Sequence, residues 1–281
     1  MFSNNQRDFI RKAIGSAQRI DGRRCDDFRN IKIAILEAGQ CQAQLGKTRV
    51  CATVSCEITR PLLHRPTEGS ITFATTFPNS GLQSNSQTLV EEKICCQMLE
   101  KAFRKSQAVD TEGLCIVAGL KVWTVSVDIV VLNNDGNLLD CAALAAITAL
   151  LHFKRPDVTV TGTDITVHPE SERVGIPLSI HHIPICTTFG FFHLESSSDA
   201  VGEPNIIHIV DPNIEEEQAI TGSMNIFVNS QHEICTITCK SMLSTGKLSH
   251  CIQIATVKAE IITQIIKDAL KANELVEEKS K

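Results

Sequence analysis

The segment 122–151 constrains the fold most, because it joins a strand pattern to an uncharged helical run through a tight turn. From 122 to 129 one set of side chains is bulky and apolar while the alternate set is largely polar, the pattern of a strand with one buried face. The sequence NNDG ends this strand, and Asp140 stands at the expected N-cap of the helix CAALAAITALLHF, which stops before Pro156. The sequence therefore predicts a strand, a turn and a closely packed helix at the centre of the fold.

Apolar periodicity predicts further elements on both sides of this unit. We expect helices at 7–18, 88–105 and 250–272, the second of which begins with the capping-box spacing of Thr88 and Glu91. We expect strands at 31–36, 49–58, 70–76, 114–119, 121–132, 183–193, 206–210, 223–229 and 233–240. Helices and strands in separate blocks indicate the α+β class, with two subdomains that each combine a sheet with helices.

The boundary between the two subdomains is expected between residues 181 and 182. Residues 1–181 would form the N-terminal subdomain, including the helix at 7–18, and residues 182–272 the C-terminal one. The remaining stretch 273–281 has the sequence NELVEEKSK, a mixed charge run typical of a frayed and solvated tail. At 281 residues and 43% hydrophobic composition, the chain is long enough to bury a sizeable core.

The charge balance gives no global attraction to nucleic acid or to anionic membranes. The chain has 27 Lys and Arg against 32 Asp and Glu, a formal net charge of −5, so any contact with RNA must be local or shared with a partner. The first 30 residues form a weak basic patch, with seven basic and four acidic side chains. We interpret this patch as a solvated helix face.

The 12 cysteines are expected to be reduced thiols. The N-terminal sequence MFSNNQRDFIRKAIG lacks the apolar stretch of a secretion signal, and most cysteines lie in apolar, strand-like runs such as RVCATVSCEI. No second Cys or His pair accompanies Cys235 and Cys239 at zinc-finger spacing, so we expect no bound metal. No apolar run reaches the roughly 18 residues that a membrane helix needs, so no membrane contact is expected.

Three aspartates in the central unit have two interpretations. Asp128, Asp135 and Asp140 could form a catalytic carboxylate set. Each also has a structural explanation, because Asp128 lies on the strand, Asp135 makes the turn and Asp140 caps the helix. We favour the structural interpretation.

Four motifs in order resemble the landmarks of the RNase PH family. They are RIDGRRCDDFRNIKI, LGKTRVCATVSCEI, VDIVVLNNDGNLLDCAALAAITAL and VDPNIEEEQAITGSMNIFVN, and the resemblance covers about residues 20–272. It implies the RNase PH fold, in which a ribosomal protein S5 domain 2-like part is followed by a smaller C-terminal part. Within the family the chain most resembles the non-catalytic ring subunits of the eukaryotic RNA exosome.

Active members of this family, as the resemblance implies, degrade RNA from its 3′ end by using inorganic phosphate as the attacking group. They carry an arginine just after the Asp-Gly turn, a position that Leu139 occupies here, and Asp140 next to it would repel phosphate. No basic residue lies between Ser80 and Glu92, where a second arginine is expected, and Ser223 replaces one of two aspartates. We therefore expect a non-catalytic protein without a cofactor. The alternative is an active phosphate-dependent 3′-to-5′ exoribonuclease.

The same resemblance implies assembly into a hetero-oligomeric ring. The expected partners are other RNase PH-type subunits in a six-membered ring, S1/KH-type cap subunits and single-stranded RNA in the central channel, in the nucleus, nucleolus and cytoplasm. Candidates for contact with RNA phosphates are Arg60, Arg65, Lys101, Arg104 and Lys105. For Arg104 and Lys105, pairing with the negative end of the preceding helix is an equal alternative. A free adaptor that binds transcripts outside a ring is a further possibility.

Overall fold

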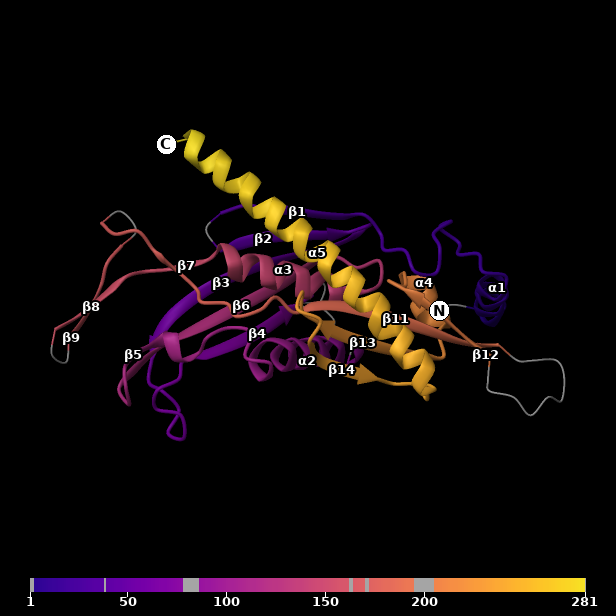
Figure 1. The fold of residues 1–281 in the computed structure, drawn as a ribbon, viewed down its shortest axis with the longest axis horizontal. Helices are drawn as coiled ribbons and strands as arrows, with labels where there is room; N and C mark the ends of the chain where they lie inside the picture. Colours follow the sequence, from indigo (N-terminus) through magenta and orange to yellow (C-terminus); the bar gives the residue numbers. More distant parts are fainter. Residues whose placement is uncertain are drawn as a thin grey trace.

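Two sheets organise the protein in the computed structural model, which describes residues 3–37, 39–77, 86–161, 164–169, 172–194 and 205–280. The first sheet contains β1 (Ile31–Ile35), β2 (Gln40–Leu45), β3 (Thr48–Thr59), β4 (Ser70–Thr76), β5 (Cys115–Val117) and β6 (Lys121–Asn133). Its order is β1-β2-β3-β6-β4, with β5 paired to the start of β6, and only β4 runs parallel to its neighbour. Figure 1 shows this sheet in indigo to magenta, as the strands come from the first half of the chain.

The alternating strand pattern determines which face of this sheet is buried. On β6, Val125, Val127 and Ile129 are fully buried, whereas the intervening side chains are less so. Helix α3 (Leu138–His152) packs on β2, β3 and β6 over that face, and its residues from Asp140 to Leu150 are all buried. The strand, turn and buried helix predicted for the centre of the fold are therefore confirmed.

The predicted N-cap of helix α3 is wrong. The helix begins at Leu138, and its N-cap is Asn137, whose φ of 52° is in the left-handed region. Asp140 lies inside the first turn instead. Asn tolerates the left-handed conformation better than most residues, so the chain can enter the helix directly after the Asp135-Gly136 turn.

The second sheet contains β11 (Ile185–Leu194), β12 (Asn205–Val210), β13 (Gly222–Val228) and β14 (Ile234–Cys239) in the order β12-β11-β13-β14. All its pairs are antiparallel, and the short helix α4 (Ile214–Ala219) connects β12 to β13. One hydrophobic core runs through both sheets, since Phe73 and Ile147 belong to the same buried cluster as Phe189 and Ile226.

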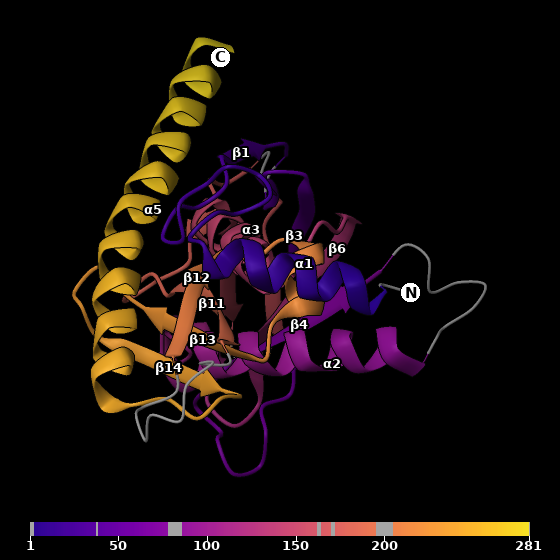
Figure 2. The ribbon, with the colours of Figure 1, turned by 90° about the vertical axis from the view of Figure 1, so that its right-hand side faces the viewer.

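Helix α5 (Thr245–Ser280) is longer at both ends than predicted. It packs on β1, β11 and β13, and Figures 1 and 2 show its C-terminal end extending beyond the rest of the protein. The stretch 273–280, expected to be frayed, continues the helix, and five of its eight residues, three Glu, one Leu and one Lys, are good helix formers. The Asn273 side chain also lies 3.3 Å from Nε2 of His152, which connects this part to α3.

The N-terminal half contains two further helices. Helix α1 (Asn4–Gly15) begins earlier than the predicted 7–18, because Ser3 and Gln6 form a capping box, and it packs on α4. Helix α2 (Ser86–Glu100) continues as a π-helical turn, η1 (Lys101–Lys105), in place of the last turn of the predicted helix. Two sequence predictions fall outside the described residues. They are the segment 78–85, which includes part of the stretch where a second phosphate-binding arginine was expected, and the Thr88 side chain of the predicted capping box.

Several short elements have no clear signal in the sequence. They are β2, the 3-10 turn η2 (Glu112–Leu114), the pair β7 (Lys154–Arg155) and β10 (Ile176–Pro177), and the hairpin β8 (Val158–Thr161) and β9 (Asp164–Val167). All 12 cysteines are free, as predicted. No helix in the described ranges is long and apolar enough to cross a membrane.

Candidate functional site

The Asp135-Gly136 turn and the first turn of α3 lie directly against helix α4. The backbone N–H of Ile214 donates to the carbonyl of Asp135 across 3.1 Å. Gly136 has a φ of +86°, and a Cβ there would lie 2.4 Å from the backbone atoms of Asn213 and Ile214. Only glycine allows this close approach, so the turn brings the start of α3 and the acidic helix α4 together. We call the site formed by Asp135 to Leu139 and Glu217 the α3 entry.

A carboxylate of the protein itself lies at the α3 entry. The Glu217 side chain accepts a hydrogen bond from the backbone N–H of Asn137 across 2.7 Å. The N-terminus of a helix attracts anions because its N–H groups and its dipole are both positive there. Glu217 on α4 therefore places a carboxyl group of the chain itself at this position, and desolvation raises its pKa to about 7, although the hydrogen bond from Asn137 and the charge of Arg29 act in the opposite direction.

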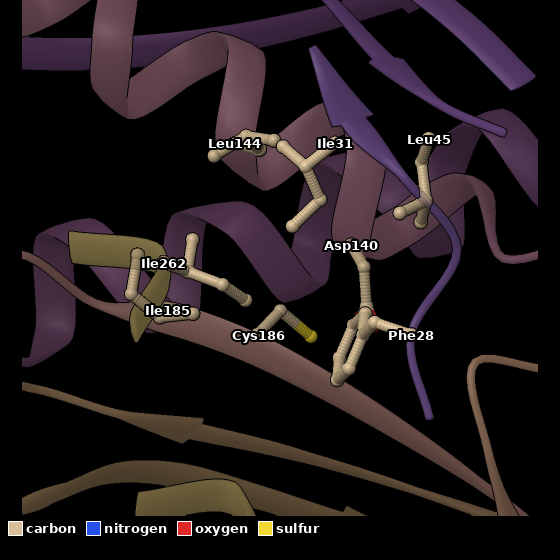
Figure 3. A pocket seen from close by; sticks show the side chains of 8 residues that line it. All are labelled: Phe28, Ile31, Leu45, Asp140, Leu144, Ile185, Cys186 and Ile262. Atoms are coloured by element: carbon tan, nitrogen blue, oxygen red, sulfur yellow. The ribbon is translucent and has the colours of Figure 1, made fainter. Parts of the chain in front are cut away.

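Asp140 connects helix α3 to the second sheet. Its carboxylate accepts hydrogen bonds from Thr188 on β11, through N at 3.0 Å and Oγ1 at 2.7 Å, and from Nδ2 of Asn137 at 2.8 Å. Burial raises the pKa of Asp140, although these hydrogen bonds act in the opposite direction. Figure 3 shows Asp140 beside Cys186 at a small, mainly apolar cavity of about 20 Å³. The side chain therefore has a structural role, as the sequence analysis favoured.

Three arginines of the N-terminal segment bind buried carboxylates. Asp211 is fully buried. Its carboxylate accepts hydrogen bonds from Nε and Nη2 of Arg29, at 2.9 and 2.8 Å, and from Nη1 of Arg23 at 2.9 Å. Arg19, also buried, donates to Glu216 across 2.6 and 2.9 Å. The interpretation of the basic N-terminus as a solvated helix face is wrong for these residues. The spacing of arginines around a glycine in RIDGRRCDDFR is the signal that could have indicated a folded segment.

Among the residues that the structure describes, these contacts leave the α3 entry with no free arginine to face an incoming anion. Arg29 donates its remaining N–H groups to the backbone carbonyls of Asp135 and Gly136, each at 2.9 Å. Leu139 is partly buried against the core. Among the described residues, no group of three His, Cys, Asp or Glu side chains could hold a metal ion. The arrangement can stabilise the turn, but it offers carboxylates where a phosphate would need cations.

The five basic residues that the sequence singled out line one open hollow with a volume of about 1320 Å³. Arg60 and Arg65 lie in the loop that follows β3, and Lys101, Arg104 and Lys105 lie on η1. All five are exposed. We call this feature the basic hollow. The structure thus brings residues together that are about 40 positions apart in the sequence.

The π-helical turn presents its basic residues outward. Ala102 and Phe103 are fully buried, so Lys101, Arg104 and Lys105 lie on the opposite, solvent-facing side. Basic residues in the last turn also interact favourably with the helix dipole, so this alternative role remains open for them. The hollow also carries acidic side chains, Glu68, Glu100, Asp110 and Glu112.

Comparison with known proteins places the chain in a family. The model of the 3′ exoribonuclease family, domain 1, matches residues 27–156, and that of domain 2 matches residues 182–258. The chain therefore belongs to the RNase PH family of 3′ exoribonucleases. Its fold is also similar to a chain of an archaeal exosome core, with a TM-score of 0.73 and 25% identity over 94% of this chain and 97% of the other.

Relatives within the family share one description. The chain is 41% identical to exosome complex component RRP45 of Rattus norvegicus over 98% of its own length and 62% of the relative's. It is 38% identical to exosome complex component rrp45 of Schizosaccharomyces pombe, with 95% of this chain and 90% of the relative covered. The chain thus spans less than two thirds of the rat relative.

Proposed function

We propose that this chain is a non-catalytic structural subunit of the RNA exosome ring, which supports the 3′-to-5′ processing and degradation of RNA by other subunits. The hydrogen bond from Asn137 to Glu217 carries the proposal. It positions a carboxylate at the helix N-terminus where active members of the family bind phosphate. The names of the relatives support the assignment to this complex.

The electrostatics of the α3 entry oppose phosphorolysis. The attacking phosphate carries negative charge and needs guanidinium or N–H donors that are free to hold it. Here Leu139 stands at the position of the expected arginine, and the guanidinium of Arg29 is already bonded to Asp211 and two carbonyls. Glu217, whose pKa desolvation raises to about 7, occupies this position, and its ionised form would repel phosphate at contact distance. Among the described residues, the α3 entry therefore offers no free guanidinium group for the attacking phosphate.

The proposed partners are other RNase PH-type subunits in a six-membered ring and S1/KH-type cap subunits, with single-stranded RNA passing through the channel. In this proposal the basic hollow contributes to the lining of the channel through Arg60, Arg65, Lys101, Arg104 and Lys105. The complex would work in the nucleus, nucleolus and cytoplasm.

The test of this proposal is the set of chains that accompany the protein. An affinity-tagged chain is purified from its own cells at moderate salt, and the co-purifying proteins are identified by mass spectrometry. Other RNase PH-type chains in equal amounts, with a particle size well above 31 kDa, are expected. A stable monomer that purifies without them would contradict the proposal.

A further inference from the structure

We infer that Glu68 sets how strongly the basic hollow holds RNA, because its carboxylate keeps the Arg65 guanidinium away from RNA phosphates. The inference rests on the proposed function, in which this hollow contacts the RNA strand. It concerns the regulation of that contact. Its basis is a difference between Arg65 and the other basic residues of the hollow.

Among the described residues, one of the five basic side chains has a carboxylate partner, and it is Arg65. Nη1 of Arg65 lies 2.8 Å from Oε2 of Glu68, three residues further along the same loop. Within the described ranges, no ion pair is formed by the other four, Arg60, Lys101, Arg104 and Lys105. A phosphate that enters the hollow meets four free cations and one that is already neutralised.

The loop backbone keeps this pair in place. The loop 60–69 is attached at two points, where Gly69 N donates to the carbonyl of Thr111 and Gly119 N donates to the carbonyl of Pro66, each at 2.8 Å. Gly69 also lies too close to Leu114 for any larger residue, since a Cβ would be 2.5 Å from that side chain. A fixed loop holds the two side chains near each other with less loss of entropy than a mobile loop would.

The exposure of the pair limits the size of the effect. The side chains of Arg65 and Glu68 are 50% and 30% exposed, so solvent screens their attraction. Pairs of this kind change an equilibrium by about two- to fivefold. An RNA phosphate can therefore displace Glu68, and replacing Glu68 by glutamine should increase RNA affinity by about that factor.

The chain offers a matched control for the loss of negative charge. Glu112 lines the same hollow, is exposed and forms no ion pair among the described residues. Glu112→Gln removes the same charge from the hollow without releasing an arginine. Arg60→Ala is the matched control for Arg65→Ala, because Arg60 lines the same hollow and has no carboxylate partner in the part of the chain that the structure describes.

The experiment measures the affinity of a fluorescently labelled oligo(U) RNA by anisotropy at several salt concentrations. It uses the full chain as it purifies, with any accompanying subunits. Glu68→Gln is expected to bind about two- to fivefold more tightly than wild type, and more tightly than Glu112→Gln. The slope of log affinity against log salt should steepen by roughly 0.7, the value for one added phosphate contact on a single strand.

A double-mutant cycle supplies the second readout. Arg65→Ala should weaken binding more in the Glu68→Gln background than in wild type, whereas Arg60→Ala should weaken it equally in both. Equal effects of Glu68→Gln and Glu112→Gln, or an Arg65→Ala effect that is independent of Glu68, would overturn the inference. A failure of the proposed function would be seen in a different measurement, because the purified chain would then lack the other ring subunits.

Discussion

The carboxylate of Glu217 lies 2.7 Å from the backbone nitrogen of Asn137, in front of the first turn of helix α3. The two residues are 80 positions apart in the sequence. Asn137 lies between β6 and α3, whereas Glu217 lies on α4 between β12 and β13. Their contact therefore depends on how the Asp135-Gly136 turn packs against helix α4. This contact fills the anion position at the start of the helix with a carboxyl group of the chain itself, and the ionised form of Glu217 would also repel an external anion.

Arg29→Ala should lower the free energy of unfolding by about 3–5 kcal/mol, because it leaves the buried carboxylate of Asp211 without its main partner. The Arg29 side chain is 9% exposed and that of Asp211 is fully buried. Urea unfolding followed by circular dichroism measures the change. Arg24→Ala is the control, since Arg24 is exposed and should change stability by less than about 0.5 kcal/mol. Equal effects of the two substitutions would show that the buried pair contributes nothing.

Gly136→Ala should destabilise the protein by more than Gly119→Ala does. Both glycines have positive φ, at +86° and +75°, so alanine is strained at either position by about 1–2 kcal/mol. At Gly136 the added Cβ would also lie 2.4 Å from the backbone at Asn213, whereas nothing lies within 4 Å at Gly119. Overpacking should add about 1–3 kcal/mol at Gly136 alone. Thermal unfolding of the two variants measures the difference, and identical melting temperatures would refute the close packing of turn and helix.

Asp140→Asn should change how stability depends on pH. Burial raises the pKa of Asp140 above its ordinary value of 3.8, so the folded state binds the proton more tightly than the unfolded state. The stabilisation from this proton is complete below pH 3.8 and is lost as the pH rises through the raised pKa. The asparagine variant lacks this loss, so its stability relative to wild type should increase from pH 4 towards pH 7.

Asp128→Asn is the matched control for this pH dependence. Asp128 is exposed on β6, so its replacement should shift the melting temperature by a similar small amount at every pH. The measurement is the melting temperature of each variant minus that of wild type across the same buffers. A pH-independent difference for Asp140→Asn would contradict the assignment of Asp140 as a buried carboxylate with a raised pKa.

The sequence predicts the larger elements because their periodicity is long enough to be specific. The pattern over 121–132 corresponds to β6, and the run after Asp140 corresponds to α3. The four-residue strands β8 and β9 are missed because so few residues cannot establish a period. The extension of α5 to Ser280 is missed because charged residues at a terminus are also typical of a solvated tail.

The roles of single charged residues depended on contacts that no local pattern encodes. Asp140 has the position of a cap in the sequence, yet its carboxylate bonds to Thr188, 48 residues away. Arg19 and Arg29 resemble surface residues until Glu216 and Asp211 are brought to them, more than 180 positions along the chain. The basic hollow likewise forms only when the loop after β3 lies beside η1. The sequence identifies the five basic residues as candidates, but only the tertiary structure shows that they line the same hollow.

The most direct test of the central claim measures phosphorolysis by this chain alone. The purified chain is incubated with 3′-end-labelled RNA, inorganic phosphate and Mg²⁺, and the released nucleotides are separated by chromatography. Because Glu217 and Leu139 occupy the positions where the proposal expects a phosphate-binding arginine and its anion, we predict no nucleoside diphosphates above the level without protein. Phosphate-dependent release of nucleoside diphosphates by this chain would contradict the account.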